Sequence, residues 1–478
     1  MNKLVSNYIY NSLYQLLILL IPIITIPYIS RVLGPEGVGI NAYSLSIVQV
    51  FMLFAVLGIP LYGNRQVASV KKSGKEVTSI NFWNVYLIQL ISSVFFVVLY
   101  LSFVFFYVKD NKVIFYIQLF MLISSMLDIS WLFIGLEELK KVVIRNTFVR
   151  LLSLILIFTF VNDQGDLALY VLINVLTNVF GQALMWTQAF KYITPLRFKD
   201  INLSVHIKPI MLIFLPQVII QLYVIVDRIL LGVFVSEIEV GFYEQALKLV
   251  KITLSVVTSM STVMLPRIAA EFAQGNMEKI KTYSNIVVRF VLFITLPMTV
   301  GLVGIAPTFA PWFFGPGYEK VGVLVIIMSP IIVLIGLSNV FGMQILVPTQ
   351  KQNKLTLSVS AGAIISIVVN LILIRYIASI GTAIATLMAE FTVVLIQLFF
   401  VKEFINYKKL AKAFVNYGAI SLLMGVIIYL IGDNLETSVL LVTIVQIGIG
   451  CLFYFIILLL LKDKFLFSIV NRIIRRKG

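Results

Sequence analysis

Cysteine and histidine are almost missing from this chain. Its 478 residues include one of each, Cys451 and His206. A single cysteine cannot form a disulfide within the chain or supply the ligands of a cysteine-bound metal site. His206 lies in a basic stretch between two apolar runs, so we expect a solvated loop residue there, and neither a histidine metal cluster nor a catalytic triad.

Charged residues are also scarce, and acidic ones most of all. They make up 12% of the chain, with 37 basic and 21 acidic residues, whereas 60% of the residues are hydrophobic. Soluble domains carry about 25% charged residues, so this composition indicates an integral membrane protein. The G-x-x-x-x-G-K-[ST] phosphate loop is missing too, which argues against ATP hydrolysis. Energy would then come from an ion gradient, the membrane potential or the substrate's own gradient.

What the chain has instead is a succession of long apolar runs. About twenty residues are needed to cross ~30 Å of hydrocarbon at a helical rise of about 1.5 Å per residue. We identify fourteen such runs, at 8–30, 38–62, 82–107, 113–135, 142–161, 167–190, 209–232, 241–266, 284–306, 321–347, 355–376, 379–401, 413–432 and 437–461. The first has no cleavage site after a short apolar core, so we expect it to be retained. The prediction is an all-α integral membrane protein with about 14 transmembrane helices.

The basic residues predict its orientation. An even number of spans puts both termini on one side, and most of the 37 basic residues lie at the termini or beside the loops after even-numbered runs. Five lie on the other side: Arg31, Lys109, Lys112, Lys320 and Arg375. By the positive-inside rule both termini are cytoplasmic. The net charge of +16 then reflects topology and contact with anionic membrane lipids, and no nucleic-acid partner is expected.

Matched positions indicate an internal duplication. Three pairs share an offset of 202 residues: Gly39 and Gly241, Arg65 and Arg267, and Gln15 and Gln217. The offset spans six runs, so both copies have the same orientation and are related by a pseudo-two-fold axis along the membrane normal. The predicted parts are an N-terminal six-helix lobe (1–190), a cytoplasmic linker (191–208), a C-terminal six-helix lobe (209–401), and two extra transmembrane helices with a basic cytoplasmic tail (402–478).

Polar side chains recur at helical spacing within three of the runs. They are Asn7, Asn11 and Gln15 in the first run, Asn174, Asn178 and Gln182 in the sixth, and Gln217, Gln221 and Arg228 in the seventh. A polar group that faces lipid has no partner and costs several kcal/mol. These rows therefore line a cavity shared by the lobes, or form hydrogen bonds between helices. Both explanations stay open.

The eighth run carries the most continuous polar stripe, which consists of Glu244, Lys248, Lys251, Ser255, Ser259 and Thr262. A lysine in hydrocarbon costs roughly 2.5–3.5 kcal/mol, so Lys248 and Lys251 must face water, a partner or an anion. We interpret the two lysines as a cationic wall. Snorkelling to the interface, or an ion pair between Glu244 and Lys248 one turn away, are the alternatives.

Four acidic residues are candidates for coupling or gating: Glu244, Asp128, Glu390 and Asp227. Asp128 and Glu390 lie within apolar runs and have no obvious partner nearby in the sequence. Buried carboxylates commonly carry coupled protons, or bind Na⁺ when ionised. Asp227 adjoins Arg228 near the predicted outer mouth, where a simple ion pair is an equal alternative. No cofactor or metal site is expected, and the coupling ion, H⁺ or Na⁺, stays open.

Seven segments of the chain resemble a known family in sequence and order. They are RVLGPEGVG (31–39), LGIPLYGNR (57–65), WLFIGLEE (131–138), DRILLG (227–232), VGFYEQALK (240–248), MLPR (264–267) and IGTAIAT (380–386). Over about 400 residues the chain resembles the Wzx-type flippases of bacterial polysaccharide repeat units. That family belongs to the superfamily of the multidrug and toxin exporters and the peptidoglycan-precursor flippase.

The resemblance implies a transporter of the bacterial cytoplasmic membrane, not an enzyme. It would move undecaprenyl-diphosphate-linked oligosaccharides to the outer leaflet by alternating access, for capsule, O-antigen or exopolysaccharide assembly, beside a polymerase and chain-length machinery. Lys248 and Lys251 would bind the diphosphate, and Arg31 and Arg228 would attract it at the outer mouth. Arg65 and Arg267 would capture it at the inner mouth, unless they are ordinary positive-inside anchors.

Other functions fit less well. A multidrug exporter of the superfamily favours cations, so its cavity should be acidic rather than lined with lysines. A peptidoglycan-precursor flippase differs in the sugar head, and the segments above argue for the polysaccharide branch. A membrane glycosyltransferase or polymerase needs a sizeable outer loop, and the longest predicted here is 307–320.

Overall fold

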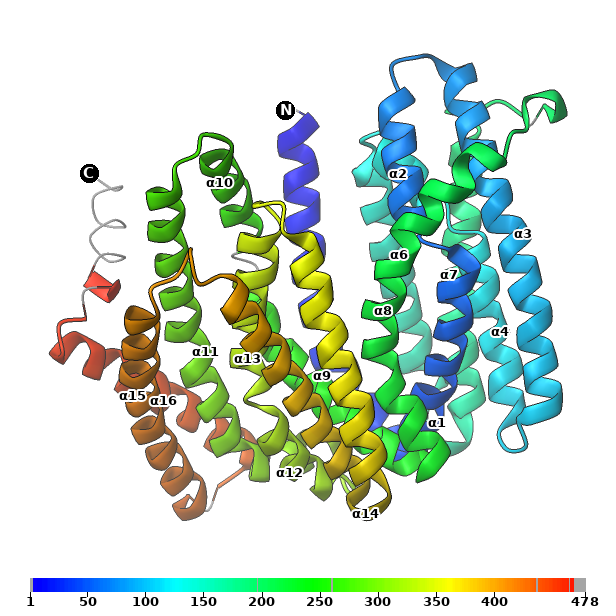
Figure 1. The fold of residues 1–478 in the computed structure, drawn as a ribbon. Coiled ribbons are helices and arrows are strands. Elements are labelled where there is room, and N and C mark those ends of the chain that lie inside the picture. The colour runs from blue at the N-terminus through cyan, green and yellow to red at the C-terminus, as the bar shows by residue number, and fades with distance from the viewer. Residues whose placement is uncertain (1–2, 196, 259–260, 436, 464, 468–478) are drawn as a thin grey trace. The chain divides into compact units, whose positions relative to one another are not determined.

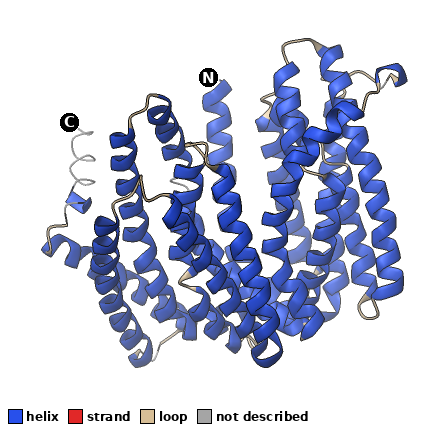
Figure 2. Cartoon of the chain, in the orientation of Figure 1, coloured by secondary structure: helices blue, strands red, loops and turns tan. Residues whose placement is uncertain are grey.

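The chain is helical throughout the part that the structure describes (Figures 1 and 2). The computed structural model describes residues 3–195, 197–258, 261–435, 437–463 and 465–467. Within these ranges the side chains of residues 3–19, 198, 255–258, 261–266 and 433–434 lie outside the description. Two compact units follow one another along the chain, Met1–Gly241 and Phe242–Gly478.

The described part of the first unit contains eight α-helices and two 3₁₀ turns. The α-helices are α1 (Lys3–Val56), α2 (Ile59–Val70), α3 (Lys75–Tyr107), α4 (Lys112–Met126), α5 (Ser130–Gly135), α6 (Leu139–Phe160), α7 (Leu167–Ala189) and α8 (Ser204–Phe234). The 3₁₀ turns are η1 (Gln164–Asp166) and η2 (Phe198–Asp200). Helix α9 (Glu237–Thr258) begins at the end of this unit.

The second unit continues from α9. Its further helices are α10 (Ser261–Ala273), α11 (Met277–Phe314), α12 (Glu319–Met328), α13 (Ile331–Ser338), the π-helix η3 (Asn339–Leu346), α14 (Gln352–Phe400), α15 (Tyr407–Asn434) and α16 (Val439–Leu460). Helices α11, α15 and α16 pack on one another (Figure 1).

Two of these helices each cover two of the predicted spans. Helix α1 is interrupted at Gly34, whose φ of 67° glycine adopts without strain. Helix α14 is interrupted at Ile377 and Ala378. Among the described residues, ten helices are long and apolar enough to cross a membrane, or eleven if the bent pair of α12 with α13 and η3 is one span. The chain is therefore a multi-pass integral membrane protein, and the count of fourteen spans stays a prediction.

Two expectations about loops are wrong. Helix α11 continues through Pro307 and Pro311 to Phe314, so much of 307–320 is helix, because neighbouring helices in a bundle compensate for the backbone groups that proline frees. Helix α8 begins at Ser204, so His206 lies in its first turn rather than in a loop. His206 is buried, and its Nδ1 lies 2.7 Å from the hydroxyl oxygen of Tyr62 on α2.

Two of the family-like segments pack on each other in the first unit. The segment 57–65 includes the start of α2, and the segment 131–138 includes most of α5. These two helices are in contact. A Cβ added to Gly63 would overlap the ring of Trp131, and one added to Gly135 would overlap the side chain of Val67. Trp131 is itself buried and stacks on Phe82 of α3 at 5.2 Å between ring centroids. These glycines are thus needed for close helix packing.

The repeated glycines also meet in the first unit. A Cβ on Gly39 of α1 would overlap the carbonyl oxygen of Glu237, and one on Gly241 would overlap that of Pro35. The contact is reciprocal, because the backbone nitrogen of each glycine lies 3.0–3.2 Å from a Cβ built on the other. The backbones of α1 and the start of α9 therefore touch at the matched positions.

The boundary between compact units does not follow the predicted lobes. Helix α8 packs on α1, α2 and α3, so the first compact unit extends to Gly241. The predicted parts are defined by the sequence repeat and not by how compactly the chain packs. Their division into 1–190, 191–208, 209–401 and 402–478 therefore stays a prediction.

Candidate functional site

Helix α9 separates its charged residues from its apolar ones. Glu244 and Lys248 form an ion pair at 3.5 Å, with 14% and 38% of their side chains exposed, and Lys251 is exposed one turn later. Leu249 and Val250, between the two lysines, are buried. The ion pair considered as an alternative for Lys248 is therefore present, and Lys251 extends the charged face beyond it.

The rest of the predicted stripe is not described. The side chains of Ser255, Ser259 and Thr262 lie outside the described residues. The same holds for Asn7, Asn11 and Gln15 on α1.

The polar row on α8 lies in several environments. Gln217 is half-buried, and its Oε1 would be 3.4 Å from a Cβ on Gly58. Gln221 is exposed. Asp227 is buried, whereas Arg228 is half-buried and donates from Nη1 to the carbonyl oxygen of Val224 at 3.1 Å. Gln221 is thus the most accessible member of this row.

At least one member of the amide row on α7 forms a hydrogen bond to another helix. Asn174 accepts a hydrogen bond from Ser153 of α6 at 3.2 Å and donates to the carbonyl oxygen of Tyr170 at 2.9 Å. Asn178 donates to the carbonyl oxygen of Asn174 at 2.8 Å. Interhelical bonding, one of the two explanations left open by the sequence, therefore holds for Asn174.

Asp128 lies at the break between α4 and α5, inside a polar network. Its Oδ1 accepts from the backbone N–H of Ser130 at 2.8 Å and from the Ser130 hydroxyl. Arg145 of α6 donates to that hydroxyl oxygen at 2.7 Å. Gln89 of α3 donates to the carbonyl oxygen of Asp128 at 3.0 Å and accepts from the Trp131 indole at 3.2 Å. The network satisfies backbone groups that the break in the helix leaves free.

The expectation that Asp128 lacks a partner nearby in the sequence is therefore wrong, since Ser130 is two residues away. Sequence reasoning also missed Gln89 and Arg145. No periodic signal could have found them, because each comes from a different helix.

The remaining predicted residues are spread over both units. Arg31 on α1 and Arg65 on α2 are exposed in the first unit, and Arg267 on α10 is exposed in the second. Glu390 on α14 is half-buried. Near it, the hydroxyls of Tyr243 and Thr386 lie 2.9 Å apart, so the family-like segments 240–248 and 380–386 are in contact within the second unit.

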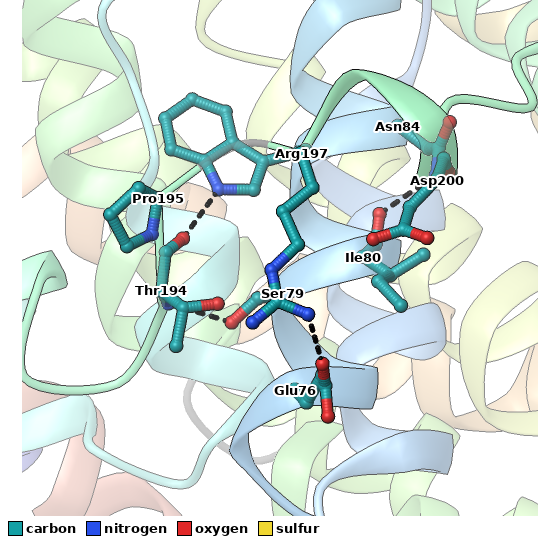
Figure 3. Close-up of a pocket in the computed structure, with 9 residues that line it drawn as sticks. Glu76, Ser79, Ile80, Asn84, Thr194, Pro195, Arg197 and Asp200 are labelled. Atoms are coloured by element: carbon teal, nitrogen blue, oxygen red, sulfur yellow. Dashed lines mark hydrogen bonds and ion pairs between the residues drawn. The ribbon is translucent and has the colours of Figure 1, made fainter.

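The predicted linker is hydrogen-bonded along the start of α3 (Figure 3). Thr194 donates its N–H to the Ser79 hydroxyl and accepts from the Trp83 indole, both at 2.8 Å. Asn84 donates to the carbonyl oxygen of Asp200 at 3.0 Å, and Arg197 pairs with Glu76. The pocket lined by these residues measures only about 10 Å³, so it is a polar joint rather than a substrate site.

Comparisons with known proteins agree with this fold. The family described as "Polysaccharide biosynthesis protein" matches residues 4–272, more than half of the chain. A protein of Escherichia coli (strain K12) named "Putative O-antigen transporter" is 25% identical over 407 residues, covering 83% of this chain and 96% of its own length. A protein of the same name in Shigella dysenteriae is 27% identical over 389 residues, covering 80% and 96%.

A solved structure of the lipid II flippase MurJ, in an inward closed conformation, is similar over nearly the whole chain. It covers 96% of this chain and 99% of its own, with a TM-score of 0.70 and 19% sequence identity. At that identity the likeness concerns the fold alone, an all-helical membrane bundle.

Proposed function

We propose a function from one premise: this chain belongs to the family of polysaccharide biosynthesis proteins. It is a flippase that moves an oligosaccharide repeat unit, linked to undecaprenyl diphosphate, from the inner to the outer leaflet. The names of the two O-antigen relatives, each matched over nearly its full length, support this substrate class. Assembly of the O-antigen, capsule or exopolysaccharide follows outside the membrane.

The observation that carries the proposal is the charged face of α9. Lys248 and Lys251 are accessible within their unit, on a helix whose other face is buried and mainly apolar. A diphosphate is the part of the substrate that is hardest to bring into a membrane, and ammonium groups bind it electrostatically. Glu244 holds Lys248 in place by the ion pair at 3.5 Å. The lipid tail remains in the bilayer, so the protein has to accommodate the head group alone.

Further residues have roles along the path of the head group. The residues that offer hydrogen bonds to sugar hydroxyls are Gln217, Gln221 and Asn178, with Asn7, Asn11 and Gln15 beyond the described side chains. Arg65 and Arg267 capture the diphosphate at the inner mouth, and Arg31 and Arg228 attract it at the outer mouth. Glu244, Asp128, Glu390 and Asp227 are the candidates for coupling to H⁺ or Na⁺.

The setting of this function is the bacterial cytoplasmic membrane, with both termini in the cytoplasm. The distribution of basic residues along the sequence supports this orientation. The polysaccharide polymerase and the chain-length machinery are the partners on the outer side. Transport proceeds by alternating access, in which two lobes open inward and then outward around the head group.

Complementation tests the proposal. A flippase-null, polysaccharide-negative bacterium of the matching serotype receives wild type, Lys248→Ala or Lys251→Ala at equal membrane abundance. We expect wild type to restore surface polymer and Lys251→Ala to lower it roughly tenfold, since each lost charged contact costs about 1.5–3 kcal/mol. Lys251→Arg should restore most of the activity.

Lys72→Ala is the matched control, because Lys72 is also exposed but lies in the loop after α2. Full restoration by both alanine variants on α9 would show that those lysines are structural. If wild type restores no polymer but raises resistance to cationic drugs, the multidrug-exporter alternative gains support. If the chain instead restores transport of the peptidoglycan precursor, the alternative of a peptidoglycan-precursor flippase is favoured.

A further inference from the structure

The second unit contains a large basic pocket formed by segments that are distant in the sequence. It lies between the start of α11, the turn that leads into α15, and the end of α16, and its volume is about 1430 Å³. Its charged lining residues are Glu278, Lys281, Arg289, Lys402, Lys408, Lys409, Lys412, Lys462 and Asp463. Seven of these are basic and two are acidic, so the pocket favours anions.

Most of that positive charge is available to a ligand. Arg289 is paired with Asp463 at 2.6 Å. The six lysines, in contrast, form no ion pair within the described part of the chain. Like charges held close together repel one another, and a bound anion reduces that repulsion. The pocket therefore offers several unneutralised ammonium groups to one ligand.

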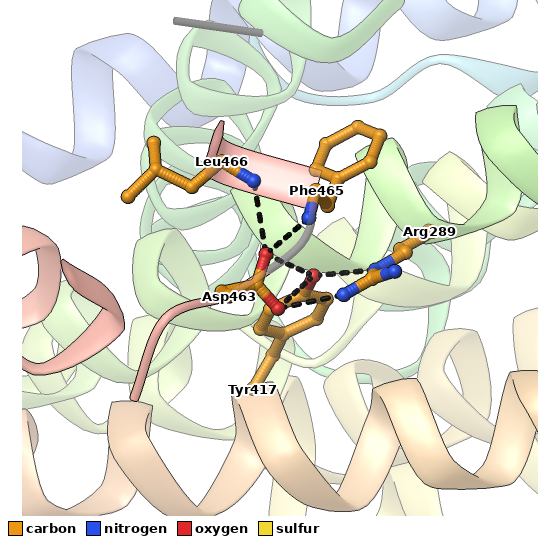
Figure 4. A network of polar contacts seen from close by, with 5 residues as sticks. All are labelled: Arg289, Tyr417, Asp463, Phe465 and Leu466. Atoms are coloured by element: carbon orange, nitrogen blue, oxygen red, sulfur yellow. Dashed lines mark hydrogen bonds and ion pairs between the residues drawn. The ribbon is translucent and has the colours of Figure 1, made fainter. Parts of the chain in front are cut away.

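A network of hydrogen bonds connects the segments that form the walls of the pocket (Figure 4). Arg289 of α11 donates to the Tyr417 hydroxyl of α15 at 2.8 Å and to Asp463 after α16 at 2.6 Å. Asp463 also accepts the backbone N–H groups of Phe465 and Leu466, both at 2.9 Å. Three separate segments are thus joined at one point, which gives the lysines a defined frame.

The start of α15 adds the partial positive charge of a helix N-terminus to the pocket. Asn406 precedes the helix, and its side chain accepts the backbone N–H of Lys409 at 3.2 Å. Asn285 of α11 accepts the N–H of Asn406 at 3.1 Å, which ties this helix start to the opposite wall. The N-terminal end of a helix carries a partial positive charge that favours phosphate groups. Here it coincides with Lys408, Lys409 and Lys412 on the first turns.

Apolar surface extends from the same helices. Val415 and Leu422 on α15, and Leu452, Leu459 and Leu460 on α16, have exposed side chains. An inorganic anion makes no use of such a surface. A lipid whose head group enters the pocket can lay its acyl chains along it.

We propose that this pocket binds the phosphate-bearing head group of an anionic phospholipid of the surrounding leaflet. The phosphate oxygens contact the lysines and the start of α15, and the acyl chains follow the apolar faces of α15 and α16. Bound in this way, the lipid holds the last two membrane helices against α11. The site is independent of the proposed transport path on α9, so either assignment can fail without the other.

A lipid-binding measurement on the purified full-length chain tests this site. Phosphatidylglycerol is the probe, phosphatidylethanolamine is the zwitterionic control lipid, and inorganic diphosphate is the soluble anion. We expect phosphatidylglycerol to bind and raise the unfolding temperature of wild type. Combined substitution of Lys408→Ala, Lys409→Ala and Lys412→Ala should weaken that binding at least about tenfold.

The matched control replaces Lys72, Lys199 and Lys208 by alanine, which removes the same charge from exposed positions of the first unit. This control should bind phosphatidylglycerol as wild type does. A triple variant with arginine at 408, 409 and 412 keeps the charge, so it should retain binding and separates loss of the site from loss of the fold. Unchanged binding by the alanine triple variant overturns the proposal, as does equal affinity for phosphatidylethanolamine. Displacement of the lipid by equimolar diphosphate would assign the pocket to soluble phosphates instead.

Discussion

At the scale of single residues, the structure distinguishes a carboxylate that is hydrogen-bonded within its own turn from an ammonium group that is exposed. Asp128 is bonded to Ser130 two residues away, and Arg145 reaches the same serine from α6. Lys251 is exposed on a helix that is otherwise partly buried. A carboxylate that accepts hydrogen bonds from its own turn mainly stabilises the backbone, whereas an accessible ammonium group can bind a substrate.

A pair of substitutions separates these roles at Asp128. An asparagine side chain at this position keeps an acceptor oxygen for Ser130, so we expect Asp128→Asn to retain membrane abundance. Asp128→Ala removes two hydrogen bonds, each worth about 1 kcal/mol, and should lower abundance. Quantitative immunoblots of membranes and the complementation assay measure both effects. If Asp128→Asn reaches normal abundance but does not transport, the coupling role suggested by the sequence is supported.

At the scale of helices, glycines set how closely the elements approach. Gly39 and Gly241 bring the backbones of α1 and α9 into contact, and Gly63 and Gly135 leave room for the Trp131 ring and the Val67 side chain between α2 and α5. In a membrane, helices associate through close packing, since lipid tails are as apolar as the side chains. At Gly39 and Gly241 an added methyl group has to move backbone atoms rather than a flexible side chain.

Gly39→Ala should therefore destabilise the protein by about 1–3 kcal/mol, the usual cost of overpacking. Gly448→Ala is the control, because a Cβ at Gly448 of α16 meets no atom within 4 Å. Alanine there should be neutral or slightly stabilising, since it favours the helix. The unfolding temperatures of both variants are measured in detergent, with size-exclusion chromatography as the readout of folded protein. Equal unfolding temperatures for the two variants would show that the contact at Gly39 has no energetic importance.

At the scale of the whole molecule, the proposed mechanism requires the two halves of the duplication to move. The sequence predicts a linker at 191–208, yet the stretch from Thr194 to Asp200 is hydrogen-bonded to the start of α3 in the first unit. It therefore moves with α3 while these bonds persist. Rocking of two lobes about this connection needs a flexible point elsewhere, or the loss of these bonds.

A crosslink tests the rocking directly. Ala68 and Ala270 are exposed, lie at the repeat offset, and each follows a predicted inner-mouth arginine by one turn. In a Cys451→Ser background, cysteines at these two positions should be joined by a bifunctional maleimide when the inner side is closed. We expect transport to stop, because the inner side can no longer open. Each single-cysteine variant, treated with the same reagent, is the control and should transport normally. Undiminished transport with the crosslink confirmed would exclude rocking of the two lobes.

The order of the membrane helices is readable from the chain alone, because burial in lipid imposes a length and a composition on every span. Each predicted run contains helix in the structure, and the family is recognisable from short segments, several of whose glycines are packing contacts. The candidate site is predicted less completely. The ion pair of Glu244 with Lys248 can be foreseen, since both residues lie on one helix at adjacent turns.

The sequence by itself thus determined the class, the helices and the family of this protein, because these depend on local hydrophobicity and on short motifs. Tertiary structure alone decided which distant polar residues meet. Gln89 and Arg145 reach Asp128 from other helices, and Arg289, Tyr417 and Asp463 come together from three segments to frame a basic pocket. The physical reason is that a hydrogen bond between helices depends on how the helices pack, and that packing leaves no periodic trace in any one of them.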